Sequence, residues 1–310
     1  MKAKVFLKYE LYSPIFKKLI PKLVLNKLLS IFARLMTIKG RKIFEQALKA
    51  PAWLEWDKLE SLQQKYPYTP RYRYDPQSVE KRGRERAKEI FNLIGTEIGR
   101  FENFLELGCF DGMVSCVLQR MGKTAIAIDI KCEGFDKRAI DGGTIFLQMD
   151  VTHLGFHDKT FDFIFSYNAF EHFAEPELVL QEAIRMLKTG GYLYLSFGPL
   201  YMSPRGLHAY PSITFPYCQF LFPEEMLERF VKLKRLAPIS FTAINHLSLE
   251  DYRQLWDRYS HRLKKVKYYE VPNVFHLDLI MKYPSCFRSK TENFDNLIIS
   301  TIEVLFRKVK

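Results

Sequence analysis

Polar side chains end several short apolar runs of this chain. Glu106 lies in the run 104–107, Asp129 ends the run 124–129, Asp150 ends 144–150 and Asn168 ends 161–168. An acid that follows the second strand of an α/β sheet accepts hydrogen bonds from both hydroxyls of a ribose. The order of these residues therefore predicts a binding site for a ligand that contains a nucleoside.

A turn with two glycines, Gly108 and Gly112, follows the first run, and Met113 begins a predicted helix. Glycine permits positive φ and lets a ligand approach the backbone closely. Strand, glycine turn and helix in this order cradle nucleotide-like ligands in α/β sheets. The spacing Gly-x-x-x-Gly differs from the G-x-G-x-x-G fingerprint, which argues against a dehydrogenase.

Apolar runs alternate with helical segments from residue 78 onward, which predicts an α/β fold with a parallel sheet covered on both faces. A helix over 78–93, with Ser78 as its N-cap, is expected beside the first strand. After the fourth strand we expect a helix with Pro176 in its first turn that ends at 187–191, and then a fifth strand over 192–197. Right-handed crossovers would gather the polar strand ends at one edge of the sheet.

The order and spacing of these motifs over about residues 80–200 resemble a class I S-adenosylmethionine (SAM)-dependent methyltransferase of the small-molecule, type 11-like group, which includes quinone-precursor methyltransferases. The segment 161–191 carries the most specific part of the resemblance. It implies a Rossmann-like, doubly wound sheet of seven strands, mostly parallel, with the seventh antiparallel. It also implies SAM as cofactor and methyl transfer by in-line displacement to a small-molecule or lipid-like acceptor.

The resemblance assigns cofactor-binding roles to residues of the strand ends and the glycine turn. Glu106 would organise the turn and the methionine ammonium group, Asp129 would bind the ribose, and Asp150 would accept from the adenine amino group. Asn168 would lie near the methyl donor. The full predicted set is Glu106, Gly108, Cys109, Gly112, Asp129, Ile130, Asp150, Val151 and Asn168.

Phe110 departs from the family pattern, which usually has a third glycine at this position. A phenylalanine adopts a glycine-type conformation only at a cost. One alternative is therefore a catalytically inactive protein that keeps the fold and docks on a membrane or partner.

Residues on the acceptor side are predicted after the fourth and fifth strands. Glu171 and His172 are candidate acid–base groups, and His208 is a candidate base for a hydroxyl acceptor. Similar methyltransferases hold a divalent metal with acid-x-x-Glu-His. Here the first of these positions is Asn168, and an amide is a weaker ligand for a hard cation, so no metal is predicted.

The formal net charge of the 310-residue chain is +12, and eight cations but no acid lie between Leu11 and Phe44. The pattern from Lys22 to Thr37 predicts an amphipathic helix that ends at Gly40, preceded by a turn of helix from Ser13. The apolar face of residues 12–48 packs on the core or on a second copy in a homodimer, or it lies on an anionic membrane. A tRNA or rRNA methyltransferase remains an alternative that draws on charge alone, because no RNA-binding motif is present.

Four segments are expected. They are a basic helical extension over 1–77 whose residues 50–77 form an irregular lid or linker, a SAM-binding core over 78–200, a substrate-cap insertion over 201–264, and closing strands over 265–310. The insertion would contain helices over 223–236 and 248–259, the second with a Ser248–Asp251 capping box. The closing part would contain strands over 265–271 and 297–306, with a helix within 276–288.

Five cysteines without C-x-x-C spacing argue against a disulfide framework or a zinc site and favour a reducing compartment. No run of about 18 apolar residues is present, and lysines interrupt the first ten residues. The expected location is cytoplasmic, with peripheral membrane contact as an option.

Overall fold

The computed structural model describes residues 22–67 and 73–309, which fall into two compact units. The helical unit consists of the described residues up to Pro67 together with Ser203–Ile239 and Pro272–Ile298. The sheet unit consists of the described residues from 73 to 202, Ser240–Val271 and the described residues from Ile299 onward. The chain passes between the units several times, so the predicted segment 201–264 is divided after residue 239.

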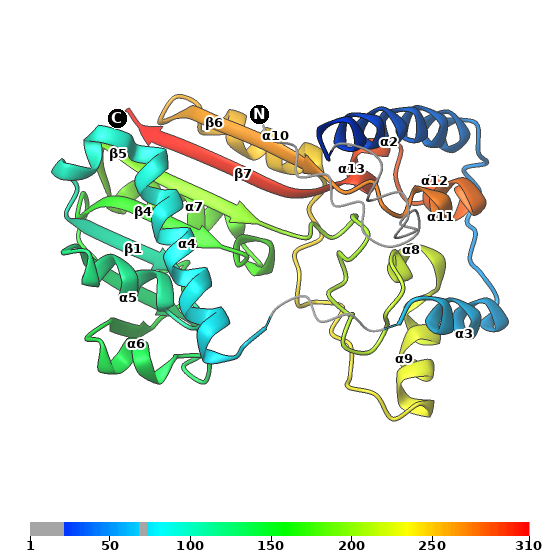
Figure 1. Cartoon of the computed structure of the whole chain (residues 1–310), viewed down its shortest axis with the longest axis horizontal. Helices are drawn as coiled ribbons and strands as arrows, with labels where there is room; N and C mark the ends of the chain where they lie inside the picture. Colours follow the sequence, from blue (N-terminus) through cyan, green and yellow to red (C-terminus); the bar gives the residue numbers. More distant parts are fainter. Residues whose placement is uncertain (1–21, 68–72, 310) are drawn as a thin grey trace. The chain divides into compact units, whose positions relative to one another are not determined.

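Seven strands form the sheet of the sheet unit, in the order β3-β2-β1-β4-β5-β7-β6 (Figure 1). They are β1 Asn103–Leu107, β2 Thr124–Asp129, β3 Ile145–Gln148, β4 Phe161–Tyr167, β5 Leu187–Phe197, β6 Leu263–Pro272 and β7 Ile299–Lys308. The pairs among β1 to β5 are parallel, and β7 runs antiparallel to β5. The predicted α/β fold with a mostly parallel seven-stranded sheet is confirmed.

Alternation of side chains along each strand assigns the helices to the two faces of the sheet. Phe104 belongs to a buried cluster with Ala87 of α4 and Val114 of α5. Its neighbour Leu105 belongs to the opposite cluster, which includes Val179 of α7 and Trp256 of α10. Both faces are thus covered, as a largely parallel sheet requires.

The helices of the sheet unit are α4 Pro76–Ile94, η1 Gly95–Arg100, α5 Met113–Arg120, α6 Lys137–Asp141, η2 Phe170–His172, α7 Pro176–Met186 and α10 Leu249–Arg258. The capping box of Ser248 and Asp251 at the start of α10 is confirmed. Ser78 is not the N-cap of α4. Asp75 is, because its carboxylate accepts from the Ser78 N–H at 3.0 Å and from the Ser78 hydroxyl at 2.7 Å.

The predicted end of α7 at residues 187–191 is wrong. The helix ends at Met186, and Leu187 already pairs with Phe161 of β4. The register of β5 shifts before Tyr192 pairs with Phe163, and Gly190 has φ of +83° within the shifted stretch. Glycine can adopt this left-handed conformation, so the bulge forms inside the strand and does not end a helix.

The helical unit contains α2 Lys22–Glu45, α3 Trp56–Lys65, α8 Cys218–Leu221, α9 Glu224–Leu233, α11 Leu277–Lys282, α12 Pro284–Arg288 and α13 Phe294–Ile298. The expectation that residues 50–77 are irregular is wrong for α3, whose Leu59 and Leu62 are buried. The predicted turn of helix from Ser13 lies outside the described residues. Among those residues, no helix has the length and apolar character needed to cross a bilayer.

Gly40 does not end the N-terminal helix, because α2 continues to Glu45. Gly40 is buried, and Phe294 and Leu277 lie at ordinary contact distance from the position that a Cβ would occupy. One turn later the ring centroid of Phe44 is 5.6 Å from that of Phe294, and Arg41 forms an ion pair with Asp295 at 2.5 Å. Contacts with α11 and α13 outweigh the low helix propensity of one glycine, about 1 kcal/mol.

Candidate active site

The turn between β1 and α5 contains three residues with left-handed backbone: φ is +66° at Gly108, +48° at Phe110 and +65° at Gly112. The turn is held to the end of β2, because the Cys109 N–H donates to the Ile128 carbonyl at 3.0 Å. The Gly112 N–H donates to the Cys109 carbonyl, also at 3.0 Å. A short apolar run that ends in glycines thus gives a strand and a tight left-handed turn directly before a helix.

Gly112 is expected to be intolerant of any side chain. A Cβ there would lie 2.2 Å from Phe146 Cε1 and would take a left-handed φ. We expect Gly112→Ala to lower the free energy of unfolding by about 2–4 kcal/mol, the sum of left-handed strain and overpacking. Urea denaturation measures this loss.

Gly122 provides the matched control, because its φ is +83° and a Cβ there would meet nothing within 4 Å. Gly122→Ala should cost only the left-handed strain, about 1 kcal/mol. Equal losses in the two variants would contradict the role that we assign to the contact with Phe146.

Phe110 adopts a left-handed backbone conformation, with φ of +48°. The left-handed region costs a non-glycine residue roughly 1–2 kcal/mol. Its N–H donates to Asp129 Oδ2 at 2.9 Å, and its exposed ring lies 5.9 Å from that of Tyr74. This hydrogen bond ties the left-handed residue to the end of β2.

Asp129 ends β2 and accepts one backbone N–H on each carboxylate oxygen. Phe110 donates to Oδ2 at 2.9 Å, and Lys131 donates to Oδ1 at 3.2 Å. An ionised carboxylate offers about four lone-pair sites, so each oxygen retains acceptor capacity. Two adjacent oxygens that each accept one more hydrogen bond match the two vicinal hydroxyls of a ribose.

Asp150 follows β3 in the loop that begins at its end. The Thr152 N–H and hydroxyl both donate to Asp150 Oδ1, at 2.9 Å and 2.8 Å. These bonds lower the pKa of Asp150, so the group is an ionised acceptor at neutral pH. The second oxygen, Oδ2, can accept from an amino group such as that of adenine.

Glu106 is a buried carboxyl group in β1, with 3% of its surface exposed. Its Oε2 accepts from the Ser115 N–H at 3.2 Å and from the Ser115 hydroxyl at 2.7 Å. Burial raises the pKa of Glu106 to about 8, with Asp111 adding to the rise and the Ser115 bonds opposing it. The group therefore holds the first turn of α5 through Ser115.

Three residues of this site were missed by the sequence analysis: Asp111, Arg82 and Tyr74. Asp111 Oδ1 accepts from the Met113 N–H at 3.0 Å, and its Oδ2 forms an ion pair with Arg82 of α4 at 2.9 Å. Arg82 also lies over the ring of Tyr74, 5.7 Å from its centroid. The sequence signal for Asp111 was its position inside the glycine turn, just before a helix. Arg82 on α4 and Tyr74 before that helix are distant from the turn in sequence.

The remaining predicted cofactor residues lie at the same strand ends. Asn168 follows β4 with φ of +51°, and its N–H donates to the Ser196 carbonyl at 2.8 Å. Ile130 follows β2 with an exposed side chain, and its carbonyl accepts from Gln148 at 3.0 Å. Val151 follows Asp150 and is half-buried. Cys109 is buried, which raises the pKa of its thiol far above neutrality and makes it a packing group.

Glu171 and His172 differ sharply in exposure although they are adjacent in η2. Glu171 is 1% exposed, whereas His172 is at the surface. The Nδ1 atom of His172 lies 2.7 Å from the Ala243 carbonyl oxygen. The Asn245 N–H donates to the Glu171 carbonyl at 2.8 Å, so the segment before α10 is bound to the loop after β4.

His208 belongs to the helical unit, and the other predicted site residues belong to the sheet unit. Its φ is +55° and its ring centroid is 6.0 Å from that of Tyr210. Its predicted role as a base stays a prediction. Within the described ranges, no group of three or more His, Cys, Asp or Glu side chains is arranged to hold a metal ion.

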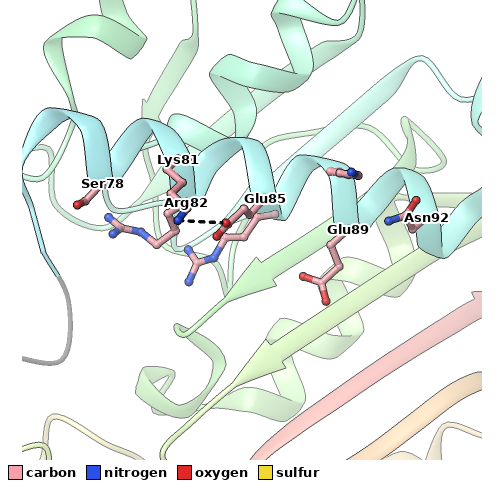
Figure 2. A pocket seen from close by; sticks show the side chains of 8 residues that line it. Ser78, Lys81, Arg82, Glu85, Glu89 and Asn92 are labelled. Carbon is pink, nitrogen blue, oxygen red and sulfur yellow. Dashed lines mark ion pairs between the residues drawn. The ribbon is translucent and has the colours of Figure 1, made fainter. Parts of the chain in front are cut away.

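A hollow of about 660 Å³ runs along α4 (Figure 2). Its lining combines charges of both signs with two neutral polar groups, and consists of Ser78, Lys81, Arg82, Glu85, Arg86, Lys88, Glu89 and Asn92. Arg82 connects it to the glycine turn through Asp111. The strand-end residues predicted to bind the cofactor do not line this hollow.

Residues 105–195 match the family model described as a methyltransferase domain. This range begins within β1, ends within β5 and contains every strand end described above. The chain therefore contains a methyltransferase domain over these residues. The acceptor atoms at the strand ends fit S-adenosylmethionine, because Asp129 can accept two ribose hydroxyls and Asp150 an amino group.

Curated relatives of this methyltransferase domain are distant. The chain is 27% identical over 120 residues to a ubiquinone biosynthesis O-methyltransferase of Parvibaculum lavamentivorans, a match that covers 36% of this chain and 47% of that protein. It is 24% identical over 192 residues to a malonyl-[acyl-carrier protein] O-methyltransferase of Calditerrivibrio nitroreducens, covering 60% of this chain and 65% of the relative. The chain thus spans about half to two thirds of the length of these relatives.

Among solved structures, a SAM-dependent methyltransferase from Methanosarcina mazei is similar to this chain with a TM-score of 0.43 and 18% identity. The similarity covers 71% of this chain and 97% of that structure.

Proposed function

We propose that the protein transfers the methyl group of SAM to an oxygen atom of a small-molecule or lipid-like acceptor. The observation that carries this proposal is the Asp129 carboxylate, whose two oxygens each accept one backbone N–H and can each accept one hydroxyl. The two curated relatives named above are O-methyltransferases, which supports an oxygen acceptor.

The bound cofactor would supply its methyl group as part of a sulfonium, for in-line displacement by the acceptor oxygen. Asp129, Ile130, Asp150 and Val151 would hold the adenosine part. Glu106, Gly108, Cys109 and Gly112 would hold the methionine part, and Asn168 would lie near the methyl group. The protein would mainly align the reacting atoms, and a group is needed to accept the proton that a hydroxyl acceptor loses.

His172 is the group best suited to accept that proton. A carbonyl oxygen only accepts hydrogen bonds, so Nδ1 of His172 carries a hydrogen toward Ala243, and Nε2 is the basic nitrogen of the neutral ring. The side chain of Glu171 is buried and that of His172 is exposed, which favours His172 for contact with an acceptor. His208 is the second candidate for this role.

The oxygen acceptor can be tested with SAM that carries a labelled methyl group and a panel of phenols, carboxylic acids and amines. We expect label in O-methyl products together with release of S-adenosylhomocysteine. Label confined to amine products would contradict the oxygen acceptor. If SAM binds but no panel member accepts the methyl group, the inactive alternative suggested by Phe110 would be favoured.

With an accepted phenol from this panel, we expect His172→Gln to lower kcat about a hundredfold and to leave SAM affinity unchanged, because general base catalysis contributes at least that much. His246→Gln is the matched control. His246 is another exposed histidine of the sheet unit, and its Nε2 is 2.8 Å from the Phe241 carbonyl oxygen. Steady-state rates of both variants measure the effect. A wild-type rate in His172→Gln would exclude His172 as the base and turn attention to His208.

A further inference from the structure

One face of α2, a helix of the helical unit labelled in Figure 1, carries large apolar side chains that are exposed. Their exposed fractions are 48% for Ile31, 45% for Phe32, 60% for Leu35 and 58% for Ile38. Ile31, Leu35 and Ile38 recur at intervals of four and three residues, so they form one stripe along the helix. We call these four residues the outer face of α2.

The opposite side of α2 is already occupied, which fixes the orientation of the helix. Gly40 and Phe44 are buried toward α11 and α13, and the Phe44 ring contacts Phe294. Arg288 of α12 lies over the Phe44 ring, 5.1 Å from its centroid. The helix therefore cannot turn its outer face inward without losing this packing.

Positive charges flank the outer face. Arg34, Lys39 and Lys42 are exposed, and the sequence contains no acid from Leu11 to Phe44. Glu45, at the last position of α2, is the acid of this helix. An exposed apolar stripe between cations is the arrangement of helices that lie in the interface of anionic membranes.

We infer that the outer face of α2 docks on a lipid bilayer with anionic headgroups. The four apolar side chains would enter the boundary between headgroups and acyl chains, and the three cations would contact the headgroups. Charge complementarity favours an anionic bilayer over a second copy of the chain. Two outer faces of α2 in contact would place cations opposite cations. The inference does not depend on methyl transfer.

Vesicle sedimentation with the full chain tests the inference. We expect binding to vesicles that contain phosphatidylglycerol, weakened by added salt, and binding about a hundredfold weaker to vesicles of phosphatidylcholine alone, since each surface cation contributes about fivefold. The triple variant Arg34→Gln, Lys39→Gln, Lys42→Gln should bind the vesicles that contain phosphatidylglycerol about a hundredfold more weakly than the wild type. Gln substitutions of Lys159, Lys232 and Lys264, exposed lysines elsewhere, form the matched control and should bind as the wild type does.

The apolar contribution is tested by Leu35→Ser combined with Ile38→Ser, which should weaken binding to anionic vesicles about tenfold. Leu233→Ser is the control, because Leu233 is equally exposed, at 60%, on α9 of the same unit. Wild-type binding by the α2 variants would overturn the inference. A second result would also overturn it. In that result, sedimentation equilibrium finds a wild-type dimer and a monomeric Leu35, Ile38 variant, and the variant still binds vesicles as the wild type does.

Discussion

Asp129→Ala should weaken the affinity for SAM about a thousandfold, because two charge-assisted hydrogen bonds to the ribose, each about 1.5–3 kcal/mol, would be lost. The variant also removes the acceptor of the Phe110 and Lys131 N–H groups, which lie at 2.9 Å and 3.2 Å from its oxygens. Both donors are at the surface and can bind water, so the fold should survive. Isothermal titration calorimetry measures the affinity.

Asp141→Ala is the control for Asp129→Ala, because Asp141 is an exposed carboxylate at the end of α6 in the same unit. It should bind SAM as the wild type does. The SAM affinity of Asp129→Asn should lie between those of Asp129→Ala and the wild type. An amide oxygen is a weaker acceptor than a carboxylate, and the amide nitrogen accepts no hydrogen bond. Unchanged affinity in Asp129→Ala would remove Asp129 from the cofactor site.

Glu106→Gln should flatten the dependence of stability on pH in the SAM-free protein. Burial raises the pKa of Glu106 to about 8, whereas in an unfolded chain the pKa keeps its ordinary value of 4.5. Between these values the unfolded state releases a proton that the folded state retains. The stabilising contribution of Glu106 is therefore complete below about pH 4.5 and is lost as pH rises toward about 8, by roughly 4 kcal/mol in all.

Urea denaturation at about pH 5, 6.5 and 8 tests this prediction. The wild type should lose stability across the series, and Glu106→Gln should lose less because its amide does not ionise. Glu102→Gln is the control, since Glu102 is an exposed carboxylate beside the start of β1 and pairs with Lys123 at 3.3 Å. Parallel pH profiles for the wild type and Glu106→Gln would show that Glu106 is already ionised in the folded protein.

Three parallel strands, β2, β3 and β4, could be located from the sequence, because each lies in a short apolar run that ends in a polar residue. The run 124–129 coincides with β2, and the run 161–168 exceeds β4 by one residue. The apolar pattern and the length of such a run suffice to identify a buried parallel strand. The same runs located Asp129 and Asp150, since the carboxyl ends of parallel strands meet at one edge of a sheet.

Elements that depend on tertiary contacts could not be predicted in this way. Gly40 ends a helix by local propensity, but packing against Phe294 and Leu277 carries α2 past it. The segment that contains α3 has prolines and aromatics on both sides, and burial of Leu59 and Leu62 stabilises the helix within it. Tertiary packing of a buried face therefore overrides the local sequence signals in both segments.

The same distinction between local sequence signals and tertiary contacts applies to the candidate site. Residues placed by a strand end were found, whereas Arg82 and Tyr74 were not, because they reach the glycine turn from α4 and the residues before it. Phe110 looked unfavourable by residue type alone. Its bond to Asp129 explains how a non-glycine residue is held there.

Calorimetric titration of the wild-type protein with SAM and with S-adenosylhomocysteine tests the central claim most directly. The geometry of Asp129, Asp150 and the glycine turn predicts a single site of about micromolar affinity or tighter for both compounds. Heat that disappears in Asp129→Ala would assign the binding to this site. The absence of binding by either compound in the folded wild type would contradict the account.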